Sequence, residues 1–187
     1  MTIKFQPLKF SPVAFPHIQR NGLRVMRAGE IHLAQQLYGH SIHYEKVWIH
    51  HGSFLPFDMQ ENHTAMTPTG EIWFEQKLYK DDFSRSDLSL KHIFMHELMH
   101  VWQKERGMNV IMRGLISGVT DYHYKLDKYR LSDYSMEQQA SIVSDYWLLK
   151  YHGFSRNSAH NLLDYNPKIP ACKLLSEYER VMGRFPN

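Results

Sequence analysis

The sequence has a single cysteine, Cys172, among its 187 residues, so no disulfide can form within the chain. The fold therefore does not depend on an oxidising compartment. We expect Cys172 to be structural and to face the core of a C-terminal helix. The sequence also has no apolar run of membrane-spanning length, and we expect no stable membrane insertion.

An excess of charge of one sign is equally absent. The chain has 22 Lys and Arg against 19 Asp and Glu, a net charge of +3, and no basic run. This balance gives no reason to expect a nucleic-acid partner. Pro7, Pro12 and Pro16 interrupt the N-terminal segment, and no apolar run of the signal-peptide type follows them. We expect the chain either to act in the cytoplasm or to leave it by a route that needs no signal peptide.

What is present suffices for a core, because 43% of the residues are hydrophobic. The length predicts one domain over residues 1–187, with residues 1–25 as an extended N-terminal arm. The apolar, glycine-bearing segment 107–120 suits a core segment or a flap over a cleft. Apolar spacing and flanking turn residues predict helices at 28–38, 90–103, 135–151 and 170–182, and strands at 41–49, 65–67 and 71–75.

The most informative stretch is His96-Glu97-Leu98-Met99-His100, an HExxH pattern. On a helix, residues four apart share one face, so His96 and His100 can bind the same zinc ion. Glu97 can then act as the base on a zinc-activated water. The expected chemistry is metal-assisted hydrolysis, most often of a peptide bond.

The context supports this interpretation. Asp87 and its neighbouring serines offer an N-cap, and Gly107 offers a stop, for a largely buried helix between them. The alternative is a pair of ordinary core histidines, but two buried imidazoles beside a Glu would be costly without a metal. His92, one turn earlier, is expected at the helix surface or behind a ligand rather than on the metal.

A third protein ligand must come from outside the motif, because catalytic zinc usually takes three. Gln103 and Arg106 stand where a metzincin carries glycine and its third histidine, which excludes that class. Glu137, at the start of the next predicted helix, is the preferred candidate. The alternatives are Asp145 first, then Asp121, His123 and Asp133.

Short strands followed by this helix suit an α+β, zincin-like fold, with a small β-sheet packed beside the HExxH helix and further helices after it. An edge strand of such a sheet can pair with an extended peptide. The oxyanion of the hydrolysis needs a donor besides zinc, and the candidates are Tyr134, Tyr122 and His123.

The run His96-Glu97-Leu98-Met99-His100-Val101-Trp102-Gln103 resembles the HExxHVWQ signature of zinc peptidase domains in bacterial polymorphic toxins. Such domains are C-terminal cargo of VgrG spike and Rhs-type proteins of type VI secretion systems. The run Glu137-Gln138-Gln139-Ala140 resembles that group's second motif, in which the Glu is the third zinc ligand.

The resemblance covers these two stretches. It implies one Zn²⁺ held by His96, His100 and Glu137, with Glu97 as the catalytic base. It further implies an antibacterial effector loaded on or fused to a secretion spike, active in the target cell's periplasm, and a cognate immunity protein in the producer. Three rivals remain: a zinc amide hydrolase acting on cell-wall peptides, a binding module with a structural zinc, and a metal-free interaction domain.

Overall fold

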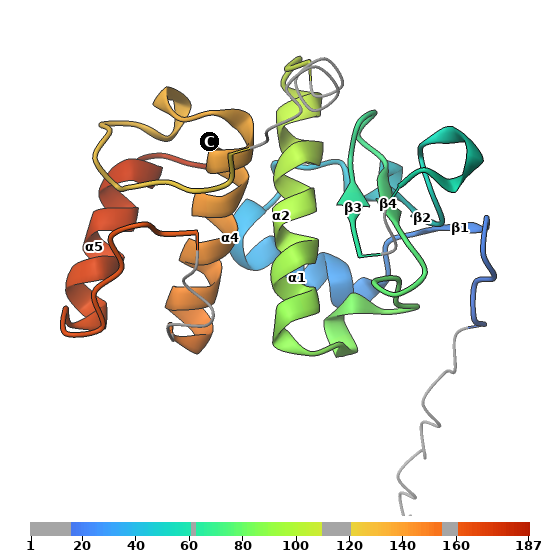
Figure 1. The fold of residues 1–187 in the computed structure, drawn as a ribbon, viewed down its shortest axis with the longest axis horizontal. Helices are drawn as coiled ribbons and strands as arrows, with labels where there is room; N and C mark the ends of the chain where they lie inside the picture. Colours follow the sequence, from blue (N-terminus) through green and yellow to red (C-terminus); the bar gives the residue numbers. More distant parts are fainter. Residues whose placement is uncertain (1–15, 61–62, 110–120, 155–160) are drawn as a thin grey trace, which may run out of the picture.

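The computed structural model describes residues 16–60, 63–109, 121–154 and 161–187. Within them a small β-sheet lies on one side of the helix that carries His96 and His100, and further helices lie on the other (Figure 1). The predicted α+β class, with the sheet beside the HExxH helix, is confirmed. No helix in these ranges combines the length and the hydropathy needed to cross a bilayer.

The sheet has four short strands in the order β1-β2-β4-β3. Strands β2 and β4 run parallel, with Ile49 opposite Ile72, and the two outer pairs are antiparallel. The strands are β1 (Leu23–Val25), β2 (Trp48–His51), β3 (Ala65–Met66) and β4 (Ile72–Phe74). Strand β3 is thus an edge strand, and it packs against the HExxH helix.

In the described part of the chain the α-helices are α1 (Ala28–Tyr38), α2 (Leu88–Glu105), α4 (Met136–His152) and α5 (Ala171–Met182). Helix α2 packs on both the sheet and α4, and α5 packs on the far side of α4 (Figure 1). Helix α1 forms hydrogen bonds with both α2 and α4. The hydroxyl of Tyr38 donates to the carbonyl of Met95 on α2 at 2.7 Å, and the indole of Trp147 on α4 donates to Gln36 at 2.9 Å.

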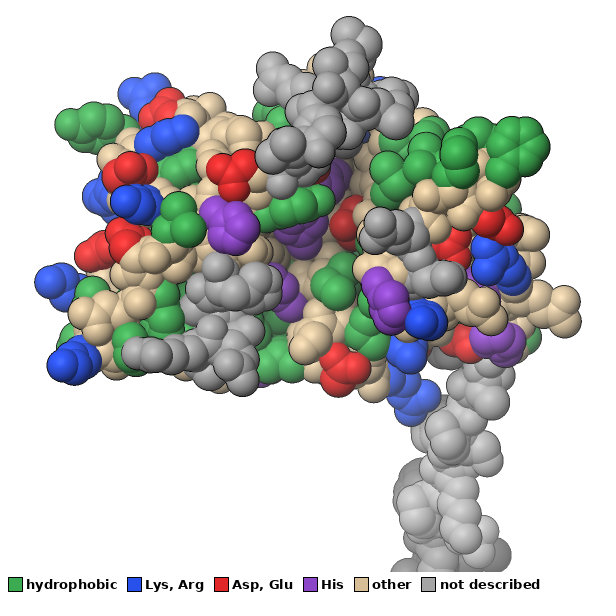
Figure 2. All heavy atoms as spheres, viewed as in Figure 1, with side chains coloured by type: hydrophobic (Ala, Val, Ile, Leu, Met, Phe, Trp, Pro, Cys, Tyr) green, Lys and Arg blue, Asp and Glu red, His purple; other side chains and the backbone are tan. Residues whose placement is uncertain are grey.

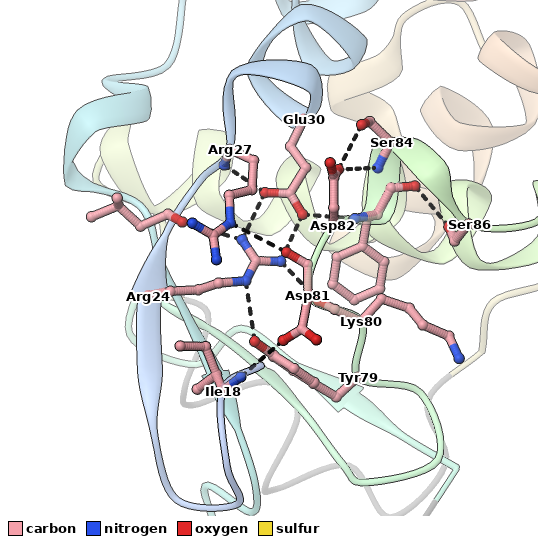
Figure 3. Close-up of polar contacts among 12 residues, drawn as sticks. Ile18, Arg24, Arg27, Glu30, Tyr79, Lys80, Asp81, Asp82, Ser84 and Ser86 are labelled. Carbon is pink, nitrogen blue, oxygen red and sulfur yellow. Dashed lines mark hydrogen bonds and ion pairs between the residues drawn. The ribbon is translucent and has the colours of Figure 1, made fainter. Parts of the chain in front are cut away.

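A buried ion pair fastens β1 to α1 (Figure 3). The guanidinium of Arg24 donates to both carboxylate oxygens of Glu30, at 2.7 and 2.8 Å. The same carboxylate accepts from the backbone N–H groups of Arg27 and Phe83. Because every oxygen of Glu30 is occupied, the cost of burying this charge is offset by hydrogen bonds as well as by its partner.

Two predictions about local structure were wrong. Residues 41–49 do not form one strand: a 3₁₀ helix at Tyr44–Lys46 comes first, and β2 begins at Trp48. Tertiary contacts hold this turn, since Glu105 of α2 accepts from the backbone N–H of His43 at 3.1 Å. Cys172 is exposed rather than packed in the core. It precedes the buried Leu174 by two residues, which on a helix is about 200° around the axis.

Of the predicted N-terminal arm, residues 1–15 lie outside the described residues, and Leu23–Val25 form β1. Most of the segment 107–120 also lies outside them. The other predicted strands and helices occur within one or two residues of the expected bounds.

Candidate metal centre

Helix α2 supplies the two histidines. Its N-terminus is capped by Asp87, whose carboxylate accepts from the backbone N–H of Leu90 at 3.0 Å. No Pro or Gly interrupts the 18 residues that follow the cap. His96 and His100 therefore lie one turn apart on one face, with ring centroids separated by 5.1 Å. That face points toward the start of α4.

Helix α4 supplies a carboxylate from its first turn. Ser135 caps this helix by accepting from the backbone N–H of Gln138 at 3.2 Å, which places Glu137 opposite α2. One oxygen of Glu137 lies 3.3 Å from Nε2 of His96 and 3.1 Å from Nε2 of His100. The candidate ligand atoms of these three residues all lie within 4.8 Å of one another.

The imidazole of His100 is held from behind by a glutamine. Gln103 is fully buried, and its Oε1 lies 2.8 Å from Nδ1 of His100. Its amide group donates to the carbonyl of Met136 at 3.0 Å and to Gln139 at 3.2 Å, so its oxygen must face the ring. An oxygen acceptor there requires the proton of His100 on Nδ1. Nε2 is then the nitrogen whose lone pair a metal ion would bind, once the ion has displaced the proton shared with Glu137.

The charges and hydrogen bonds of His96, His100 and Glu137 favour a positive charge in the space between them. Burial disfavours a proton on His100, but the hydrogen bond and the charge of Glu137 outweigh it and raise the pKa of His100 to about 9. Burial opposes ionisation of Glu137 as well, yet hydrogen bonds and charge from His100 and His96 hold its pKa well below the usual range. The same arrangement suits a divalent cation.

Glu97 lies beside this group. Its side chain is buried, and one carboxylate oxygen accepts from the hydroxyl of Thr67 at 2.7 Å. Thr67 directly follows β3, so the edge of the sheet sets the orientation of the carboxylate. Sequence reasoning missed Thr67, because nothing in its neighbourhood marks it as functional. Gln103 was noted in the motif and as a departure from the metzincin pattern, but not as a partner of His100.

Asp145, the first alternative ligand, lies outside the group. Its two oxygens accept from His92 at 2.7 Å and from the hydroxyl of Tyr124 at 2.6 Å. His92 thus turns its Nε2 toward this aspartate. Asp121 accepts from the backbone N–H of His123, and Asp133 from that of Arg130. None of these alternatives belongs to the three-residue group.

The structure also distinguishes among the three candidate donors to the oxyanion. Tyr134 donates to the carbonyl of Lys125 at 2.8 Å, and His123 pairs with Asp121 on the surface. Tyr122 is the one near the site, with its ring 5.8 Å from that of His96. Burial, with the charges of Glu137 and Glu97, raises the pKa of Tyr122 to about 12, so its hydroxyl keeps a proton at neutral pH.

Two imidazole nitrogens and one carboxylate form a donor set that suits a catalytic zinc ion. The backing of His100 by Gln103 is the outer support that metal-binding histidines usually have. The residues present therefore fit a zinc ion. They make a group that could hold a metal ion.

A solved structure has a similar fold. The chain is similar to the effector domain of Pseudomonas aeruginosa VgrG2b, with 32% sequence identity and a TM-score of 0.62, over 74% of this chain and 83% of that one. The chain belongs to the family of the VgrG2b effector domain. Among curated proteins, the type VI secretion system spike protein VgrG2b of P. aeruginosa strain PAO1 is 35% identical over 146 residues.

That match covers 74% of this chain and 14% of the spike protein, so the chain spans about one seventh of its curated relative. No family model matches the chain. The resemblance to a VgrG-borne effector domain, predicted from two short motifs, thus extends over most of the chain.

Proposed function

We propose that this chain is a zinc-dependent metallopeptidase that hydrolyses peptide bonds. The observation that carries the proposal is the convergence of His96, His100 and Glu137 from two helices, beside the carboxylate of Glu97. When bound there, zinc supplies a Lewis acid and makes water acidic enough to attack near neutral pH. His96, His100 and Glu137 would hold the ion.

Glu97 is the proposed general base and acid. The hydrogen bond from Thr67 fixes one of its oxygens, and the other remains to take a proton from the attacking water and deliver it to the leaving amine. Tyr122 is the proposed donor to the oxyanion, because it is the candidate close to His96 and carries its proton at neutral pH.

Glu97→Gln tests this mechanism. The substitution preserves shape and the acceptor for Thr67 but removes the base, so we expect hydrolysis of peptides to fall about 10²–10⁴-fold. Zinc content, measured by elemental analysis, should stay at one ion per chain. Glu45→Gln is the matched control, since Glu45 is exposed and outside the site. Full activity in a zinc-loaded Glu97→Gln protein would falsify the role of Glu97.

The biological role and the site of action are proposed from the similarity to VgrG2b. The matched protein is called a type VI secretion system spike protein, and we propose that this chain is likewise an antibacterial effector delivered with such a spike. It would leave the producer's cytoplasm without a signal peptide and act in the target cell's periplasm. The producer would need a cognate immunity protein as a partner.

Targeted expression in a bacterium tests this setting. Toxicity is expected when the chain is exported to the periplasm by an added signal sequence, and not when it stays in the cytoplasm or carries Glu97→Gln. Toxicity restricted to the cytoplasm would contradict the proposed site of action.

Two rival functions give different results in direct assays. A zinc amide hydrolase of cell-wall peptides would release fragments from peptidoglycan and leave unstructured proteins intact. A structural-zinc binding module would hold the metal with four protein ligands and would hydrolyse neither substrate.

A further inference from the structure

A cavity of about 780 Å³ adjoins the metal group. His96, Glu97 and Tyr122 form part of its wall, so it begins where the reacting bond of a substrate would lie. One side is the face of α2 that runs from Leu88 to Glu97, and the other is the segment that leads into β3. Figure 2 looks onto this face, with histidine side chains in the hollow and a cluster of apolar side chains beside it.

The cavity wall is mainly apolar. Side chains from α2, from the segments around β3 and from α4 supply it, namely Leu55, Met59, Met66, Leu88, Ile93 and Leu148. Gln60 is also part of the wall, but its amide is used inside the protein: it accepts from the backbone N–H of Phe54 and donates to the carbonyl of Thr64. It therefore offers little to a ligand.

The charges of the described cavity wall disfavour an acidic ligand away from the metal group. Among the described residues that line the cavity there is no Lys or Arg, and the carboxylate present is that of Glu97. Lys77 comes near, with Nζ 3.1 Å from Nε2 of His63, but its own side chain is exposed and does not line the wall. Away from the metal group, a buried carboxylate of a ligand would thus find no Lys or Arg among the described residues of the wall, and it would face Glu97.

The edge strand β3 lies along this cavity. Ala65 and Met66 form the edge strand and also line the cavity. A peptide that adds to a sheet edge is extended, and its successive side chains point to opposite sides. A side chain next to the bond under attack would then enter the apolar space.

We propose that this cavity is a specificity pocket for a large aliphatic or aromatic side chain adjacent to the scissile bond. The substrate class is therefore a polypeptide segment with Leu, Met or Phe at that position, and not the carboxylate-rich peptides of the cell wall. This inference rests on the proposed peptidase function and adds the substrate class to it.

The first test is hydrolysis of internally quenched peptides that differ at one residue beside the cleaved bond. With the zinc-loaded protein we expect kcat/KM for Leu, Met or Phe to exceed that for Asp or Gly by about tenfold or more, as usual for filling an apolar pocket. Equal rates for all residues, or faster cleavage of the Asp peptide or of cell-wall peptides, would overturn the pocket.

The second test does not depend on turnover. Fluorescence polarisation measures binding of the same peptides to the Glu97→Gln protein, and we expect the Leu peptide to bind about tenfold more tightly than the Asp peptide. Equal affinities would overturn the pocket. If the wild-type protein cleaves no peptide, the proposed peptidase function fails, and this binding preference alone decides whether the pocket exists.

Substitutions in the wall sharpen both tests. Met59→Lys and Leu88→Lys change side chains that are partly exposed, 60% and 38%, so the fold should tolerate them. Each is expected to abolish the preference for Leu over Asp. The matched control is Leu163→Lys, which alters a 60% exposed leucine outside the cavity and should retain the preference. An unchanged preference in both wall variants would contradict the assignment.

Discussion

Gln103 connects the two helices of the candidate metal centre through one side chain. Its oxygen faces His100, and its amide group faces the carbonyl of Met136 at the start of α4. Gln139 continues the chain of hydrogen bonds by donating to the carbonyl of Tyr134. These contacts give a physical reason for Gln103 in the first motif and Gln139 in the second: they set the tautomer of a candidate ligand and the place of the carboxylate.

Gln103→Met tests this role. The apolar side chain fills similar space but leaves His100 Nδ1 and the carbonyl of Met136 without their partner, so zinc affinity should fall about 10–100-fold. Unfolding by urea should show a loss of about 1–3 kcal/mol. Zinc affinity is measured by competition with a chromogenic chelator. Gln76→Met, at an exposed site, is the control, and zinc affinity equal to the wild type would contradict the prediction.

At the scale of single elements, the first turn of α4 decides where the third candidate ligand lies. Ser135 accepts from the N–H of Gln138, while the side chain of Gln138 accepts from the N–H of Ser135. The sequence predicted that a helix begins here, at residue 135. This reciprocal cap places Glu137 within the first turn, where a carboxylate is also favoured by the helix dipole.

Ser135→Ala removes the cap while leaving the candidate ligands in place. We expect the free energy of unfolding to fall by about 1 kcal/mol, because one N–H of the first turn loses its acceptor. Denaturant titration measures this change. Ser176→Ala is the comparison, since Ser176 is exposed in the body of α5 and does not cap it. A Ser135→Ala protein as stable as the wild type would show that α4 is fixed by packing alone.

At the scale of the whole molecule, a metal ion would join α2 to α4, the helices between the sheet and α5 (Figure 1). An ion that binds only the folded chain stabilises it by mass action, by about 2.7 kcal/mol when free zinc is at 100 times its dissociation constant. We therefore expect zinc to raise, and a chelator to lower, the urea midpoint of the whole chain.

His96→Ala and His32→Ala distinguish specific from general effects of zinc. His96 is a candidate ligand, whereas His32 is exposed on α1 and outside the group. The zinc-dependent shift should shrink strongly in the first variant and persist in the second. The same shift in both variants would mean that zinc stabilises the chain from another site.

The features that the sequence determined by itself are those that depend on residues close together in the chain. The spacing of His96 and His100 requires only the helical repeat, and the bounds of α2 and α4 follow from caps and apolar periodicity within each segment. The absence of a metzincin continuation likewise needs no structure. The sequence alone therefore predicted the α+β class and the pair of helices that meet at Glu137, although it left Asp145 open as the alternative ligand.

Tertiary structure decided whatever depends on residues far apart in the chain. It separated Asp145, held by His92 and Tyr124, from the group, and it joined Thr67 to Glu97 across 30 residues. It also turned Tyr44–Lys46 into a 3₁₀ helix and exposed Cys172, against expectation. Packing between elements sets these outcomes. The sequence pattern of a segment shows the helical repeat of that segment. It does not show which side chains from other elements will contact it.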